Sequence, residues 1–102
     1  QGKARGLVAN TMTTTLLVNE SKTKGKPMRM IDEPLLLEPV GIGMQKDQPA
    51  LTAKINAILH KLDGDGEINK IWEKWLGANT EYKMTRTEKV VPITELKFDP
   101  IP

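Results

Sequence analysis

Apolar residues recur at helical spacing in the second half of the chain and predict two helices there. Leucine and isoleucine side chains of residues 51–62 fall on one stripe, and Asp47 stands before it as an N-cap. A second stripe occupies residues 68–76 and ends at Gly77. The link between them, residues 63–66, is short and contains glycine for a left-handed cap. The two helices must therefore lie near one another and cover a shared apolar surface, which we expect to be a sheet.

Three shorter apolar runs in the first half predict strands at residues 7–9, 28–31 and 40–44. Between the first two, residues 14–21 carry apolar side chains at helical spacing behind a group of capping residues, and they predict a short helix. The run at 40–44 alternates glycine with larger apolar residues, which suits a strand that another backbone approaches closely. Each of these strands needs neighbours, and the adjacent segments supply few.

The remaining segments are predicted to be connections. Residues 21–27 hold three lysines and a glycine with nothing to bury, so they form a surface loop. Pro34 and Pro39 bracket an extended crossover that cannot be a helix interior. The helical period is lost from residue 78 to 102, which predicts an extended tail lying across a surface, with room for one edge strand near Val90.

The composition narrows the class of protein. The 102 residues suffice for one ordinary domain, and 38% hydrophobic with 27% charged residues argue against wholesale disorder. With 15 basic and 13 acidic side chains, the net charge of +2 is too balanced for a nucleic-acid-binding protein. No apolar run is long enough to span a bilayer. Without cysteine there is no disulfide framework, thiolate nucleophile or cysteine zinc site.

One acidic loop has part of the composition of a calcium-binding motif. Residues 63–68, Asp-Gly-Asp-Gly-Glu-Ile, match the centre of an EF-hand loop, which also needs oxygen ligands at its two ends. In the register that the glycine and the isoleucine set, Lys61 and Trp72 occupy the outer ligand positions, so no metal is expected. A helix-loop-helix turn in which Asp65 caps the second helix explains the same residues.

Other polar and aromatic groups fit structural roles better than chemical ones. His60, the single histidine, is expected to be solvated, and Trp72 and Trp75 lie on an apolar stripe typical of a core. The lysines within residues 22–26 are interpreted as a solvated turn and not as a phosphate site. The threonines at 13–15 have no histidine or lysine near them in sequence, so no catalytic residue is assigned.

Asn10 is the candidate ligand-binding residue. It follows a predicted buried strand and precedes a predicted helix, the place where open α/β sheets present groups to ligands beyond their strand ends. The alternative is that Asn10 acts only as the N-cap of that helix. The residue pattern by itself leaves both interpretations open.

Three blocks of sequence share the order and spacing of one protein family. They are Gly-Lys-Ala-Arg-Gly-Leu-Val-Ala-Asn at residues 2–10, Val-Gly-Ile-Gly-Met-Gln-Lys-Asp at residues 40–47, and the two-helix block of residues 51–77, which ends in Lys-Trp-Leu-Gly. Together they resemble the polar amino-acid family of periplasmic solute-binding proteins of ABC transporters. The long tail resembles that of the family's glutamate/aspartate-binding members.

The resemblance implies an α/β fold of the periplasmic-binding-protein type II, in which two lobes close on a ligand about a hinge. Residues 1–36 would finish the second lobe, residues 37–40 would form the hinge crossover strand, and residues 41–77 would complete the first lobe before the tail at 78–102. The chain, which begins with Gln1, is then interpreted as the C-terminal portion of such a protein. The missing N-terminal portion would carry most of the ligand site.

The function implied is transport without catalysis and without a cofactor. A periplasmic or otherwise extracytoplasmic protein of this family delivers a small polar solute, such as glutamate or aspartate, to an ABC transporter permease. At the position of Asn10 such proteins usually have an aspartate that accepts hydrogen bonds from the ligand α-ammonium. The amide of Asn10 still accepts a hydrogen bond but forfeits the charge-assisted contribution. A ligand that lacks an ammonium, or whose ammonium is held elsewhere, fits equally well.

Two alternatives come from other classes of protein. One is an enzyme on the same fold, such as a periplasmic cyclohexadienyl-type dehydratase, which needs a general acid or base that Asn10 cannot supply. The other is a free-standing interaction domain, which has to close its own core. We expect that this chain does not close its own core, because the predicted strands at 7–9, 28–31 and 40–44 belong to two separate sheets and leave strand edges unpaired.

Overall fold

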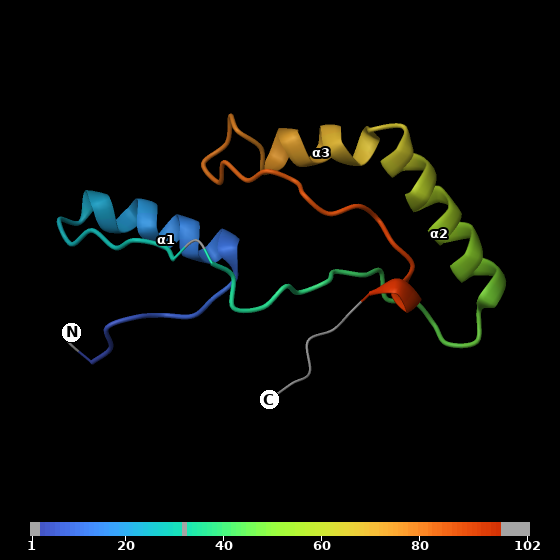
Figure 1. Cartoon of the computed structure of the whole chain (residues 1–102), viewed down its shortest axis with the longest axis horizontal. Coiled ribbons are helices and arrows are strands. Elements are labelled where there is room, and N and C mark those ends of the chain that lie inside the picture. The colour runs from blue at the N-terminus through green and yellow to red at the C-terminus, as the bar shows by residue number, and fades with distance from the viewer. Residues whose placement is uncertain (1–2, 32, 97–102) are drawn as a thin grey trace.

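The computed structural model describes residues 3–31 and 33–96. Along these residues lie three α-helices and one turn of 3-10 helix, joined by long irregular segments (Figure 1): α1 (Thr11–Thr23), α2 (Pro49–Gly64), α3 (Glu67–Trp75) and η1 (Ile93–Glu95). α2 and α3 follow one another around a corner, whereas α1 lies at the other end of the molecule. Within the described ranges, no helix combines the length and the apolar character needed to cross a membrane.

α1 begins where the sequence places its capping residues. Asn10 has an extended backbone with φ −64° and ψ 157°, and its Oδ1 accepts a hydrogen bond from Thr13 N–H at 2.9 Å. Inside the helix, Thr15 Oγ1 donates to Thr11 O at 2.8 Å, so this hydroxyl bonds to its own helix. The helix predicted at residues 14–21 is confirmed, and the cap lets it begin at Thr11.

α2 confirms the first apolar stripe, but its N-cap differs from the prediction. The N-cap is Gln48, which makes no side-chain cap hydrogen bond. Asp47 has a left-handed backbone with φ 59°, a conformation that aspartate adopts more readily than most residues. A residue in that conformation cannot also take the extended backbone of an N-cap, so the prediction of Asp47 as the cap is wrong. Pro49 occupies the start of the helix, where its missing N–H leaves no hydrogen bond unmade.

The corner between α2 and α3 is built on Gly66. This residue lies directly before α3 with φ 77°, so the predicted left-handed glycine is confirmed. Asp65 makes no cap hydrogen bond to α3, contrary to expectation, because its carboxylate forms an ion pair with Lys61, one turn back on α2. α2 and α3 contact one another across this corner.

α3 ends just before Gly77, as the sequence predicts. Leu76 N–H donates to Trp72 O at 2.7 Å and closes the last turn. Gly77 is buried against that turn, and a Cβ at this position would lie 2.6 Å from the Cα of Glu73. The stop therefore depends on close backbone approach, which glycine alone permits here.

The predicted strands are the main error at the level of secondary structure. Residues 7–9, 28–31 and 40–44 lie in irregular segments, and no strand forms among the described residues. A strand exists only through hydrogen bonds to a neighbour, and within residues 33–47 the structure has no hydrogen bond between backbone groups. The side chains of this segment are correspondingly exposed, Val40 to 98% and Leu35 to 82%. The described residues are thus helical and irregular, and the α/β class is not seen in them.

No hydrophobic core forms among the described residues. No apolar side chain is buried there, and the sheet expected beneath α2 and α3 is absent from those ranges. The molecule extends over 53 × 36 × 22 Å, with a radius of gyration of 17.6 Å. A compact domain of about 100 residues has a radius of gyration of about 13 Å. This openness agrees with the expectation that the chain does not close its own core.

A returning segment covers part of α3 in place of the expected sheet. After α3 the chain reverses and runs back along this helix toward α2 (Figure 1). Met84 N–H donates to Leu76 O at 2.8 Å, and Trp72 Nε1 donates to Met84 O at 3.1 Å. We call residues 84–92, which have an irregular backbone, the strap.

The tail predicted at residues 78–102 contains no regular element other than η1 in its described part. The edge strand considered near Val90 does not form there, since no second strand lies beside it. Residues 97–102 of the tail, and residues 1–2 and 32 of the predicted lobe segment, lie outside the described residues.

Candidate functional site

Asn10 lies at the exposed N-terminus of α1, where the chain passes from an irregular segment into the helix (Figure 1). Its Oδ1 accepts the Thr13 N–H at 2.9 Å, so the capping role is realised. A carbonyl oxygen has two lone pairs, and the amide nitrogen carries two N–H donors. Because capping uses one lone pair, the side chain keeps a second acceptor site and both donors.

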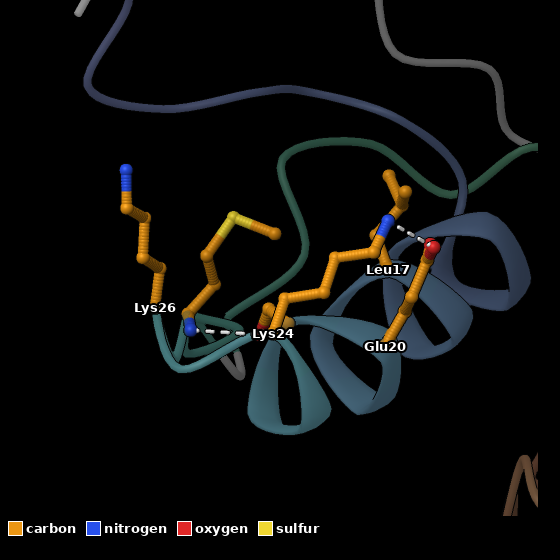
Figure 2. Close-up of a pocket in the computed structure, with 6 residues that line it drawn as sticks. Leu17, Glu20, Lys24 and Lys26 are labelled. Atoms are coloured by element: carbon orange, nitrogen blue, oxygen red, sulfur yellow. Dashed lines mark hydrogen bonds and ion pairs between the residues drawn. The ribbon is translucent and has the colours of Figure 1, made fainter. Parts of the chain in front are cut away.

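A shallow hollow lies beside α1, between the helix and the segment that follows it (Figure 2). It has a volume of about 290 Å³ and is lined by Leu17, Glu20, Ser21, Lys24, Lys26 and Met28. Figure 2 shows Lys24 reaching across to Glu20, with Nζ 2.5 Å from Oε1. This lysine is therefore already paired. Lys24 and Lys26 are exposed in the turn that the sequence predicts, whereas Lys22 lies in the last turn of α1, so the loop predicted at residues 21–27 begins only after Thr23.

Ser21 holds the segment after α1 against the helix. Its side chain is 6% exposed, donates to Val18 O at 2.7 Å and accepts the Met28 N–H at 2.9 Å. One hydroxyl thus uses both its donor and an acceptor within the chain. The hollow is a consequence of this fold-back, and Ser21 has a structural role in it.

A second, more open hollow of about 580 Å³ lies at the start of α2 and is lined by Asp47, Gln48, Pro49, Thr52, Ala53 and Asn56. Thr52 Oγ1 donates to Gln48 O at 2.9 Å, so this hydroxyl is engaged with its own helix. Every residue of the lining is exposed or half-buried. The hollow is therefore an open surface that holds no buried polar group for a ligand.

The acidic loop between α2 and α3 is occupied by the chain's own cations. The Asp65 carboxylate pairs with Lys61, and the Asp63 carboxylate pairs with Arg86. Within residues 3–31 and 33–96, no group of three metal-ligating side chains comes together. His60 is exposed on α2, as expected.

The two tryptophans of α3 have different surroundings, although the sequence predicts a core position for both. Trp72 is half-buried and donates its indole N–H to Met84 O in the strap. Trp75 is 64% exposed, with Lys74 Nζ 5.2 Å from the centre of its ring. The prediction is wrong for Trp75, because the described residues contain no layer that packs on that face of the helix.

Asp63 is the polar centre that the sequence analysis missed. Its Oδ1 lies 2.6 Å from Arg86 Nη2, and its Oδ2 accepts the Val90 N–H at 2.9 Å. The Val90 N–H and then the Arg86 guanidinium hold the pKa of the Asp63 carboxyl below its ordinary value of 3.8. Helical spacing could not reveal this cluster, because its members come from α2 and from the strap.

Comparison with known proteins places the chain in a protein family. The family model for bacterial extracellular solute-binding proteins, family 3, matches residues 5–78. Among curated proteins, the ABC transporter glutamine-binding protein GlnH of Bacillus subtilis (strain 168) is 38% identical to this chain over 53 residues, which cover 52% of this chain and 19% of GlnH. The chain thus spans far less than two thirds of that relative. No solved structure matches it significantly.

The matched range takes in the three blocks that carry the resemblance, except for residues 2–4, and it ends at residue 78, where the tail begins. It includes Asn10 and the block at 40–47, and it continues through α2 and α3 to the residue after Gly77. It covers well over half of the chain, so the resemblance is confirmed at the level of the family. The chain belongs to family 3 of the bacterial extracellular solute-binding proteins.

Proposed function

We propose that this chain is part of an extracytoplasmic solute-binding protein that delivers a small polar solute to the permease of an ABC transporter. The observation that carries the proposal is the family match over residues 5–78. The relative GlnH, a glutamine-binding protein of an ABC transporter, supports an amino acid as the class of solute. Glutamate or aspartate remains our choice, on the resemblance of the tail to that of glutamate/aspartate-binding members.

The proposal includes a two-lobed α/β fold completed by further polypeptide. Residues 1–36 then finish the second lobe, residues 37–40 cross the hinge, and residues 41–77 complete the first lobe. Two features support it: residues 33–47 make no backbone hydrogen bonds among themselves or to other described backbone groups, and the apolar side chains beside the hinge are exposed. A sheet supplied by the N-terminal portion of the protein would satisfy both.

Asn10 is the ligand-binding residue of the proposal. In a closed cleft its free Oδ1 lone pair would accept a hydrogen bond from the α-ammonium of an amino acid. The charged ammonium already strengthens this bond, and a carboxylate acceptor would add the attraction between two opposite charges. Replacing the amide by a carboxylate should therefore strengthen the binding of α-amino acids.

The test is calorimetric titration of the complete protein with glutamate, aspartate and glutamine. Asn10→Asp keeps the cap acceptor and adds a charge, and we expect it to bind amino acids about fivefold or more tightly, since about 1.4 kcal/mol corresponds to tenfold. Asn10→Ser is the matched control that keeps a cap but loses the amide, and it should bind more weakly. Unchanged affinity for every amino acid in both variants would remove Asn10 from the site.

Transport, and not catalysis, is the proposed activity. The rival enzyme, a cyclohexadienyl-type dehydratase, needs a general acid or base at the ligand. The amide of Asn10 cannot exchange a proton with substrate at neutral pH, so the one candidate site residue of this chain offers no such group. An assay of the complete protein for dehydration of a cyclohexadienyl acid should show no turnover, and measurable turnover would favour the enzyme.

A further inference from the structure

The strap of residues 84–92 is attached to both helices of the corner. At one end, Trp72 of α3 donates its indole N–H to Met84 O at 3.1 Å. Toward the other end, the Asp63 carboxylate of α2 binds Arg86 through Oδ1 and the Val90 N–H through Oδ2. The strap therefore bridges α2 and α3 outside the loop that joins them.

The Asp63–Arg86 ion pair differs from the other ion pairs of the described residues. Its two side chains are 12% and 14% exposed, whereas the side chains of the other three pairs are between 47% and 75% exposed. Those three pairs join residues three or four apart along the chain. Exposed pairs of that kind contribute little, and a shielded pair with an added backbone hydrogen bond contributes more.

The corner itself has little else to fix its angle. Gly64 and Gly66 flank Asp65, both have open space around them, and Gly66 takes a left-handed backbone. No apolar side chain is buried between the two helices in the described part of the chain. A hinge of this kind is free to change angle unless a second connection restrains it.

We propose that the strap is a detachable brace that sets the angle between α2 and α3, with Asp63 as its latch. When the charge of Asp63 is removed, Arg86 and the Val90 N–H lose the carboxylate that binds both of them, and the strap leaves the corner. Trp72 then loses its hydrogen bond to Met84 and becomes solvated. The brace does not depend on which solute the protein carries, so its test is separate from that of the proposed function.

The first experiment measures the attachment of the strap in the complete protein. Asp63→Asn keeps the size of the side chain and removes its charge, and we expect the Val90 amide to exchange its hydrogen about tenfold faster. In a background where Trp75 and every tryptophan outside this chain are replaced by phenylalanine, the emission of Trp72 should shift to longer wavelength. The matched control is Asp65→Asn, which removes an exposed pair on the same loop and should change neither signal.

The second experiment measures the angle. In the complete protein, spin labels are placed by Lys54→Cys on α2 and Asn69→Cys on α3; these 102 residues contain no other cysteine, and any cysteine elsewhere in the protein is replaced by serine. We expect a narrow distribution of label distances with Asp63 present and a broader one with Asp63→Asn. An unchanged distance distribution together with an unchanged Val90 exchange rate would overturn the brace.

A double-mutant cycle keeps the proposal testable if Asp63→Asn also weakens the helices. Arg86→Gln removes the other charge of the pair, and the Val90 exchange rate is compared in both single variants and in the double variant. A combined effect no larger than the greater single effect supports the latch, because both changes then break one interaction. Additive effects would show that the two residues act independently and would contradict it.

Discussion

Asn10 and Gly66 each set the local backbone at the start of a helix. Asn10 starts α1 with one hydrogen bond to Thr13, and Gly66 turns the corner with a left-handed backbone. Sequence reasoning identified both residues because caps and left-handed glycines are local signals. The prediction failed at Asp47, because the residue type does not show that its backbone is left-handed; the N-cap of α2 is Gln48.

Removing the cap should weaken α1. Asn10→Ala leaves the Thr13 N–H without its acceptor, and we expect a loss of about 1 kcal/mol in the stability of the first turn, or roughly fivefold faster hydrogen exchange at the Thr13 amide. Asn10→Asp keeps an acceptor oxygen and should leave that rate nearly unchanged. Equal exchange rates in the alanine variant and the parent chain would show that the cap contributes nothing.

The two glycines of the corner should respond to alanine with opposite sign. Gly66→Ala forces an L-residue into the left-handed region, at a cost of about 1–2 kcal/mol. Gly64→Ala lies in α2 with open space around it and should stabilise the helix by up to about 1 kcal/mol. The Lys70 amide, which donates to Gly66 O at 3.0 Å, reports the first change by faster exchange. Similar effects of the two variants would contradict the assigned backbone.

Among the elements, the helices could be predicted and the strands could not. Each hydrogen bond of α2 closes within one turn, so the stripe of residues 51–62 carries nearly all the information. A strand at 40–44 depends on a partner that the described residues do not contain. The Asp63–Arg86 contact could not be predicted for a related reason. No rule of sequence spacing links the end of one helix to a segment that returns after the next helix.

Attachment of the strap should depend on pH. The Val90 N–H, the Arg86 guanidinium and, more weakly, the charge of Lys89 lower the pKa of Asp63 below 3.8 and outweigh its partial desolvation. Because the pKa of Asp63 is lower in the folded state than in the unfolded state, its carboxylate stabilises the fold fully at any pH above the unfolded pKa. This stabilisation is lost as the pH falls through the folded-state pKa. We therefore expect the strap to stay bound from pH 7 down to about 4 and to detach below it.

Fluorescence of Trp72 in the complete protein, with Trp75 and every tryptophan outside this chain replaced by phenylalanine, follows this detachment. The emission should stay constant at neutral pH and shift only in acid, and the transition should be absent from Asp63→Asn. Asp65→Asn should retain it, because Asp65 pairs with Lys61 outside the strap. A transition centred well above pH 4, or one that persists in Asp63→Asn, would assign the effect to another group.

At the scale of the whole molecule, apolar surface is left open. Leu37, Val40, Ile71 and Trp75 are between 58% and 98% exposed, and they come from the hinge segment and from α3. The family could be recognised from the sequence, because its motifs are contiguous, but the three-dimensional arrangement could not be derived. The match to GlnH reaches only 19% of that protein, and we propose that the remaining portion supplies the sheets that cover this surface.

The most direct test of this account is small-angle X-ray scattering on the 102-residue chain, combined with a thermal melt followed by circular dichroism. We predict a radius of gyration near 17.6 Å or above and a gradual loss of helix without a cooperative transition. A radius of gyration near 13 Å with a sharp two-state melt would show a self-contained domain with its own interior. That result would contradict the proposal that further polypeptide completes the fold.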